Sequence, residues 1–128
     1  MKRLIASTLA ALALSLGAAS ASADTAPSSV IHVVTVAWKK GTTPEQIQAA
    51  LDGVKALPAA FPGITHVWVN SVKVQNPPGT EVKRTHVFVM EFKDAQALKD
   101  YADSDAQKKW YEVYMPIRAQ STTHDITN

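Results

Sequence analysis

The order of apolar and polar positions divides the chain into a βαββαβ series. Residues 30–38 (VIHVVTVAW) are dense in β-branched side chains and predict a strand, which Gly41 ends. Similar patterns predict a second strand over 64–74 and a third over 84–92. The polar segment 119–127 predicts a last strand, which we expect at an edge of the sheet.

Capping signals show where helices begin between these strands. The TPEQ sequence at 43–46 is a capping box with proline at the first helical position, and apolar residues follow it at helical spacing. Pro58, and then Pro62-Gly63, are expected to end this helix. Asp94 is expected to cap a second helix, and Ser104 with Gln107 forms a second capping box that opens a third.

Both faces of the first and third predicted strands are largely apolar, because successive side chains point to opposite faces. The even face carries Val30, His32, Val34, Val36, Trp38, His86, Phe88, Met90 and Phe92. The odd face carries Ile31, Val33, Thr35, Ala37, Thr85, Val87 and Val89. Right-handed crossovers place both sets of helices on one face, so the other face needs a different cover. We assign the even face, with its larger side chains, to the helices and the odd face to a second copy of the chain, in a homodimer.

The N-terminal residues have the three-part pattern of a secretory signal peptide. Lys2 and Arg3 precede an apolar run over 4–16, and Ala-x-Ala sequences end at Ala21 and Ala23. The run is too short to be a convincing membrane span, which needs about 20 residues. We expect cleavage after Ala23 and export to the periplasm or the medium; an uncleaved anchor is the alternative.

Removal of the signal peptide, residues 1–23, leaves a flexible segment over 24–29 and one domain over 30–128. The composition is ordinary for a globular protein, with 46% hydrophobic and 19% charged residues. The formal charge of +2 falls to zero once Lys2 and Arg3 are removed, so neither nucleic acid nor an anionic membrane is favoured as a partner. The chain has no cysteine, which excludes disulfides, a thiolate nucleophile and cysteine-ligated metals.

Each predicted strand contains one of the four histidines: His32, His66, His86 and His124. Imidazole is a common zinc ligand, so a metal site is one hypothesis. Pairing the midpoints of the first and third strands leaves His32 and His86 four residues out of step, which is roughly 14 Å and too far for a shared ion. We therefore predict no metal and no other cofactor. His32 and His86 are then either hydrogen-bonded core imidazoles or residues that line a pocket.

Several short motifs along the chain, in this order, resemble those of the stress-responsive A/B barrel family, called Dabb. They are His32 with Trp38-Lys39, Thr43-Pro44-Glu45-Gln46, Phe61-Pro62-Gly63-Ile64, Thr85-His86, Glu91-Phe92, Asp94, Leu98, Tyr101 and Asp125. The resemblance covers nearly all of the predicted domain. It implies a ferredoxin-like α+β unit with a four-stranded antiparallel sheet and helices on one face, two copies of which pair into a dimeric barrel.

The resemblance also has an implication for chemistry. A plant branch of the family resembles polyketide cyclases, in which a tyrosine and a histidine in a pocket between sheet and helices perform acid–base catalysis. By this resemblance Tyr101 matches the pocket tyrosine, His32 and His86 match two strand histidines, and Gln107 stands where the catalytic histidine is expected. Glutamine cannot accept a proton near neutral pH, so we do not expect cyclase chemistry to survive.

We expect a small apolar pocket between sheet and helices, with His32, Trp38, His86 and Tyr101 as its ligand-binding residues. The alternative for Tyr101 is core packing with a satisfied hydroxyl, and for Trp38 it is packing or the dimer contact. Two classes of function follow. The first is an exported dimeric protein that binds a small apolar or aromatic molecule without strong catalysis, or that has a purely structural role in stress. The second is an enzyme, polyketide-cyclase-like or cofactor-free monooxygenase-like, in which His32, His86 and Tyr101 are catalytic. Gln107 favours the first.

Overall fold

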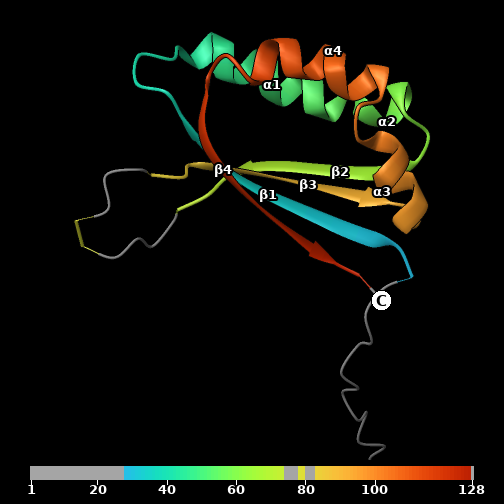
Figure 1. The fold of residues 1–128 in the computed structure, drawn as a ribbon. Coiled ribbons are helices and arrows are strands. Elements are labelled where there is room, and N and C mark those ends of the chain that lie inside the picture. The colour runs from blue at the N-terminus through green and yellow to red at the C-terminus, as the bar shows by residue number, and fades with distance from the viewer. Residues whose placement is uncertain (1–27, 74–77, 80–82, 128) are drawn as a thin grey trace, which may run out of the picture.

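The computed structural model describes residues 28–73, 78–79 and 83–127, and the order of its elements matches the predicted βαββαβ series (Figure 1). The elements are β1 (Val30–Trp38), α1 (Pro44–Lys55), α2 (Leu57–Ala60), β2 (Ile64–Ser71), β3 (His86–Phe92), α3 (Ala95–Tyr101), α4 (Asp105–Tyr114) and β4 (Arg118–Ile126). The predicted signal peptide lies outside the described residues. Among the helices of the described part, none is long and apolar enough to cross a membrane.

The four strands form one antiparallel sheet in the order β2-β3-β1-β4, with the helices on one face (Figure 1). The predicted pairing of Val34 with Phe88 is confirmed, and β4 lies at an edge of the sheet as expected. The register also places His32 opposite Met90 and Val36 opposite His86. The two histidines are therefore four positions apart along the strands, as the sequence predicted.

The predicted start of α1 is confirmed, and the helical segment ends before Pro62-Gly63 as predicted, but it is divided into α1 and α2. The Thr43 hydroxyl accepts from the backbone N–H of Gln46, and the Gln46 side chain accepts from the N–H of Thr43, which completes the capping box. Pro58 does not end this helix, because α1 already stops at Lys55. Pro58 instead lies in the first turn of α2, where its missing N–H has no helical partner to lose.

The second crossover also departs from the sequence pattern at one cap. Asp94 accepts from the N–H of Ala97 and starts α3 as predicted. The Ser104 hydroxyl accepts from the N–H of Gln107, but the Gln107 side chain accepts from the N–H of Asp103 rather than from that of Ser104. Only half of the predicted capping box therefore forms. The reason lies in Asp103, whose φ of 64° places the chain in the left-handed region just before the helix.

The core lies between the even face of the sheet and the helices, as predicted. Its aromatic centre is formed by Phe88, Trp110 and Tyr114, with Trp110 and Tyr114 stacked at 4.5 Å between ring centroids and both in edge contact with Phe88. The buried sheet residues are Val30, Val34, Val36, Ile64, Phe88, Met90 and Phe92, together with Ala37 on the odd side near a bulge. Burial of these side chains holds the helices to one face.

No described helix covers the opposite face of the sheet, which we call the open face (Figure 1). Cross-strand partners project from the same face, so the residues of β2 and β4 that pair with odd residues of β1 and β3 also lie on the open face. The open face carries Ile31, Val33, Thr35, Val87, Val89, Glu91, His66, Trp68, Asn70, Gln120, Thr122, His124 and Ile126. Trp68 is 52% exposed and Ile126 50% exposed, so large apolar side chains on this face lack a cover within the described part of the chain.

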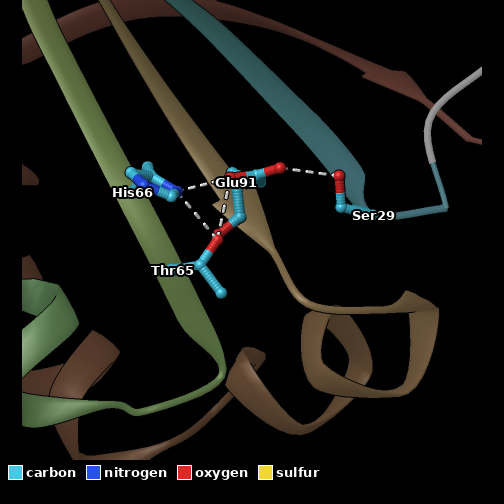
Figure 2. Close-up of polar contacts among 4 residues, drawn as sticks. All are labelled: Ser29, Thr65, His66 and Glu91. Atoms are coloured by element: carbon cyan, nitrogen blue, oxygen red, sulfur yellow. Dashed lines mark hydrogen bonds and ion pairs between the residues drawn. The ribbon is translucent and has the colours of Figure 1, made fainter.

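One polar cluster interrupts the open face, and Figure 2 shows it. The Glu91 carboxylate accepts hydrogen bonds from the Ser29 hydroxyl at 2.8 Å, the Thr65 hydroxyl at 2.9 Å and His66 Nδ1 at 2.6 Å. A register shift between Ile64 and His66 lets two successive residues of β2 reach the same carboxylate. These donors lower the pKa of Glu91, and the hydrogen bond from Ser29 has the largest effect.

Candidate functional site

A cavity of about 400 Å³ lies on the helix side of the sheet, against α3 and α4. Its lining comprises His32, Val34, Phe88 and Met90 from the central strands; Leu98, Lys99, Tyr101, Ala102, Gln107, Trp110, Tyr111 and Tyr114 from the helices and the turn between them; and Arg118, Ser121, Thr123 and Asp125 from β4. The central strands supply mainly apolar groups and the helices supply aromatic ones. The polar groups are concentrated on the edge strand.

The edge strand is polar on its cavity side because of its pairing with β1. Ser121, Thr123 and Asp125 pair with Val36, Val34 and His32 respectively, and cross-strand partners project from the same face. Sequence analysis did not assign these three residues to the pocket. Segment 119–127 has no apolar alternation, so only its register with β1 shows which of its side chains face the helices.

His32 is held by a carboxylate at one end of the cavity. Its Nδ1 lies 2.5 Å from Oδ1 of Asp125, its cross-strand neighbour. An ionised carboxylate only accepts hydrogen bonds, so Nδ1 carries the proton, and Nε2 is the nitrogen that remains for a ligand. His32 also makes an edge contact with the ring of Phe92. The His32 side chain is 17% exposed, which fits a group that is oriented but still accessible.

Two tyrosine hydroxyls on the cavity lining are buried and have no hydrogen-bond partner among the described residues. They belong to Tyr101 on α3 and Tyr114 on α4. The ring of Tyr101 packs against Phe61 and Phe92, so the core-packing alternative describes its ring but not its hydroxyl. Because an unpartnered buried hydroxyl costs roughly 1–3 kcal/mol, each hydroxyl favours a ligand or water that supplies a partner.

Burial keeps these hydroxyls protonated. It raises the pKa of Tyr101, and the neighbouring Tyr111 adds to the rise. Burial also raises the pKa of Tyr114, although Ser121 and Arg118 lie close enough to its hydroxyl to oppose the effect. Both phenols are therefore hydrogen-bond donors at neutral pH.

The structure separates the four residues that the sequence assigned to the pocket. His32 and Tyr101 line the cavity, whereas Trp38 and His86 do not. Trp38 instead donates its indole N–H to His86 Nδ1 at 2.9 Å, at the opposite end of β1 from His32. His86 is thus the hydrogen-bonded imidazole of our alternative, and burial lowers its pKa. Trp38 packs at the edge of the core, in edge contact with Tyr114.

Gln107 lines the cavity at the position where the family resemblance places a catalytic histidine. Its side-chain oxygen is already used by the N–H of Asp103, so the side chain serves the start of α4. Trp110 lines the cavity and also packs in the core, where it donates its N–H to the carbonyl of Ala50. Within the described ranges, no group of three or more His, Asp or Glu side chains is arranged to hold a metal ion.

Comparison with known families identifies the chain. The model of the Stress responsive A/B Barrel Domain family, Dabb, matches residues 30–128. The chain therefore belongs to this family. No curated protein sequence matches it.

Three similar solved structures show the same fold. A Dabb family protein with a ferredoxin-like fold from Mesorhizobium loti is 21% identical, with 78% of this chain and 96% of that chain covered and a TM-score of 0.61. A hydroxynitrile lyase from Passiflora edulis is 17% identical, with 80% and 95% covered and a TM-score of 0.65. A dimeric ferredoxin-like protein of unknown function from Thermobifida fusca is 16% identical, with 78% and 91% covered and a TM-score of 0.63. The predicted ferredoxin-like fold is confirmed.

Proposed function

We propose that this protein binds a small aromatic or apolar molecule in the cavity between the sheet and α3–α4, without strong catalysis. The observation that carries the proposal is the buried hydroxyl of Tyr101, which has no hydrogen-bond partner among the described residues and lies on a cavity with apolar and aromatic walls and a polar edge strand. A volume of about 400 Å³ suits a small ligand, and a few polar groups within apolar walls are typical of such sites. The ligand accepts a hydrogen bond from Tyr101 and donates one to His32 Nε2.

Weak or absent catalysis follows from the side chains that could move a proton. Gln107 has no proton-accepting group, and its oxygen is held by Asp103. General acid–base catalysis typically contributes 10²–10⁴-fold, so the loss of one such group is a large loss.

The second candidate is an enzyme of the polyketide-cyclase or cofactor-free monooxygenase type, and the His32–Asp125 pair favours it. A carboxylate that orients an imidazole is a common arrangement for a general base. Tyr101 is then the acid. His86 has no part in this alternative, because it lies outside the cavity with its Nδ1 bound to Trp38. The neighbour from Passiflora edulis is an enzyme, which keeps this candidate open.

The protein acts as a homodimer joined through its open faces. Trp68, Ile126 and the valines at 33, 87 and 89 leave an apolar surface that no part of the described chain covers. The similar protein from Thermobifida fusca is dimeric. A standard stable interface buries about 1,600 Å² in total. If about 60% of that area is apolar, at about 25 cal/mol per Å² the gross gain is about 24 kcal/mol before association costs.

Export is the proposed location, on the strength of the Met1–Ala23 pattern alone. N-terminal sequencing of protein from the producing cell tests it. We expect a mature chain that starts near Asp24. A cytosolic species that retains Met1 contradicts export.

Native mass spectrometry of protein purified from its own host tests ligand binding. We expect a small-molecule adduct that survives gentle ionisation, disappears on denaturation and weakens in Tyr101→Phe. Trp68→Phe, a matched change of an aromatic residue on the open face, should retain the adduct. An adduct that is equally strong in a Tyr101→Phe/His32→Gln double variant contradicts binding in this cavity. Rapid conversion of the identified molecule by the native protein, lost in Tyr101→Phe, favours the enzyme.

A further inference from the structure

The acidic side chain of the cavity lining has an ion-pair partner, whereas the lysine and the arginine of the lining have none among the described residues. Among the residues that the structure describes, Asp125 is the only acidic one in the lining, and its carboxylate is engaged by His32. The lining also includes Lys99 and Arg118. Within the described part of the chain, neither cation forms an ion pair with a carboxylate. The cavity therefore carries an excess of positive charge that a bound anion would neutralise.

Arg118 is held in place by contacts with two neighbouring side chains. Its Nη1 donates to the Ser121 hydroxyl at 3.2 Å, and its guanidinium carbon lies 5.8 Å from the ring centroid of Tyr114. A guanidinium has five N–H donors in a rigid fork that matches a carboxylate. The hydroxyl of Tyr114 lies close to both Arg118 and Ser121. Arg118, Ser121 and Tyr114 thus bring charge and hydroxyl donors together at one end of the cavity.

The register of β1 with its neighbours shows where the remainder of a ligand would lie if its anionic group were bound at Arg118. Arg118 pairs with Trp38, whereas Asp125 pairs with His32 at the other end of the same strand. Between them lie Val34 and its partner Phe88, which are both buried and both line the cavity. An anionic group at Arg118 therefore leaves the body of the ligand over apolar side chains, pointing toward Tyr101 and His32.

We propose that the ligand class of this cavity is an aromatic or apolar carboxylate whose anionic group binds to Arg118, Ser121 and Tyr114. This inference rests on the proposed function, because it assumes that the cavity binds a small molecule. It adds the sign of the ligand's charge and the direction in which the ligand lies. Charge-assisted bonds to a guanidinium are stronger than those to a neutral amide, so a carboxylate should bind about tenfold to hundredfold more tightly than its primary amide.

Isothermal titration of the full chain with 2-naphthoate and 2-naphthamide tests the inference, because the two probes differ only in the charged group. We expect naphthoate to bind at least tenfold more tightly. Arg118→Gln should remove that preference, so that the two probes bind with about equal affinity, and Arg118→Lys should retain part of it. Lys108→Gln removes an exposed charge of α4 outside the cavity, and it should retain the full preference.

The outcomes separate the two proposals. Equal affinity for the two probes overturns the carboxylate inference and leaves the proposed function standing. A preference that survives Arg118→Gln also overturns the inference, because the charge is then recognised elsewhere. If neither probe binds, both proposals fail. Melting temperatures of the Arg118 variants identify any loss of affinity that comes from unfolding.

Discussion

Trp38 and His86 form a hydrogen bond across neighbouring strands, with the indole N–H donating to Nδ1 over 2.9 Å. An indole nitrogen only donates, so Nδ1 of His86 must be without its proton. The Thr85 hydroxyl lies 2.9 Å from the same nitrogen. The pair is therefore built for a neutral imidazole, and it holds both residues outside the cavity.

The burial of His86 makes stability depend on pH. Burial lowers the pKa of His86 below its ordinary value of 6.5, so the unfolded chain binds the proton more readily than the folded one. The contribution to stability is then fully present above pH 6.5 and is lost as the pH falls through the lower pKa of the folded state. Urea unfolding between pH 8 and pH 5 should show a smaller pH slope for His86→Gln than for the unmutated protein. An imidazole NMR titration that gives His86 a pKa of 6.5 or higher contradicts the account.

The Glu91 cluster on the open face has an acid dependence at lower pH (Figure 2). Hydrogen bonds from Ser29, Thr65 and His66 lower the pKa of Glu91 below its ordinary value of 4.5. The stabilisation is present above that value and is lost as the pH falls through the pKa of the folded state. Glu91→Gln should therefore reduce the loss of stability below pH 4.5, measured by thermal unfolding. An unchanged acid profile in Glu91→Gln contradicts this role.

The open face should fail as an interface when it receives a charge. Val33→Asp or Val87→Asp places a carboxylate at the centre of the apolar surface, where burial without a partner is costly. We expect light scattering at micromolar concentration to show dimer for the unmutated protein and monomer or aggregate for either variant. Val113→Asp alters an exposed apolar residue on α4 and should remain dimeric. An unmutated protein that is a stable monomer contradicts the proposed dimer.

Gly53 is expected to resist substitution although it lies in a helix. A Cβ at this position would lie 2.8 Å from Cδ1 of Trp110. The indole cannot easily move, because it is fixed by its hydrogen bond to Ala50 and its stack on Tyr114. Overpacking should cost about 1–3 kcal/mol and outweigh the gain of about 1 kcal/mol in helix propensity. Chemical denaturation of Gly53→Ala should show a lower free energy of unfolding; a more stable variant would falsify this packing argument.

Much of the fold was predictable because local and periodic signals agree in it. The strand Val30–Trp38 has the predicted bounds, and alternation along it fixed which side meets the helices. Matching strand midpoints also gave the correct pairing of Val34 with Phe88. Helix caps were harder to predict where the backbone conformation is unusual. Asp103 has a left-handed conformation, and the Gln107 side chain accepts from its N–H instead of from that of Ser104.

The candidate site was predictable only in part. The alternation of side chains along a strand shows on which face of the sheet a residue lies, but it does not show whether that stretch of the strand reaches the cavity. His32, Trp38 and His86 share the even face, yet only His32 reaches the cavity. The polar side of the cavity comes from β4, where Ser121 and Asp125 are oriented by pairing rather than by an apolar pattern. The Trp38–His86 hydrogen bond likewise joins two segments that are distant in the sequence, and the sequence of neither segment predicts it.

The most direct test of the account is to locate a bound ligand on the protein. Titration of ¹⁵N-labelled protein with 2-naphthoate, followed by NMR, should shift the amide signals of His32, Tyr101 and Ser121, because these residues line the cavity. The groove between α1 and α4, lined by residues that include Ala49 and Val113, should be unaffected. Shifts confined to that groove or to the open face, with the cavity signals unchanged, would contradict the claim that this cavity is the binding site.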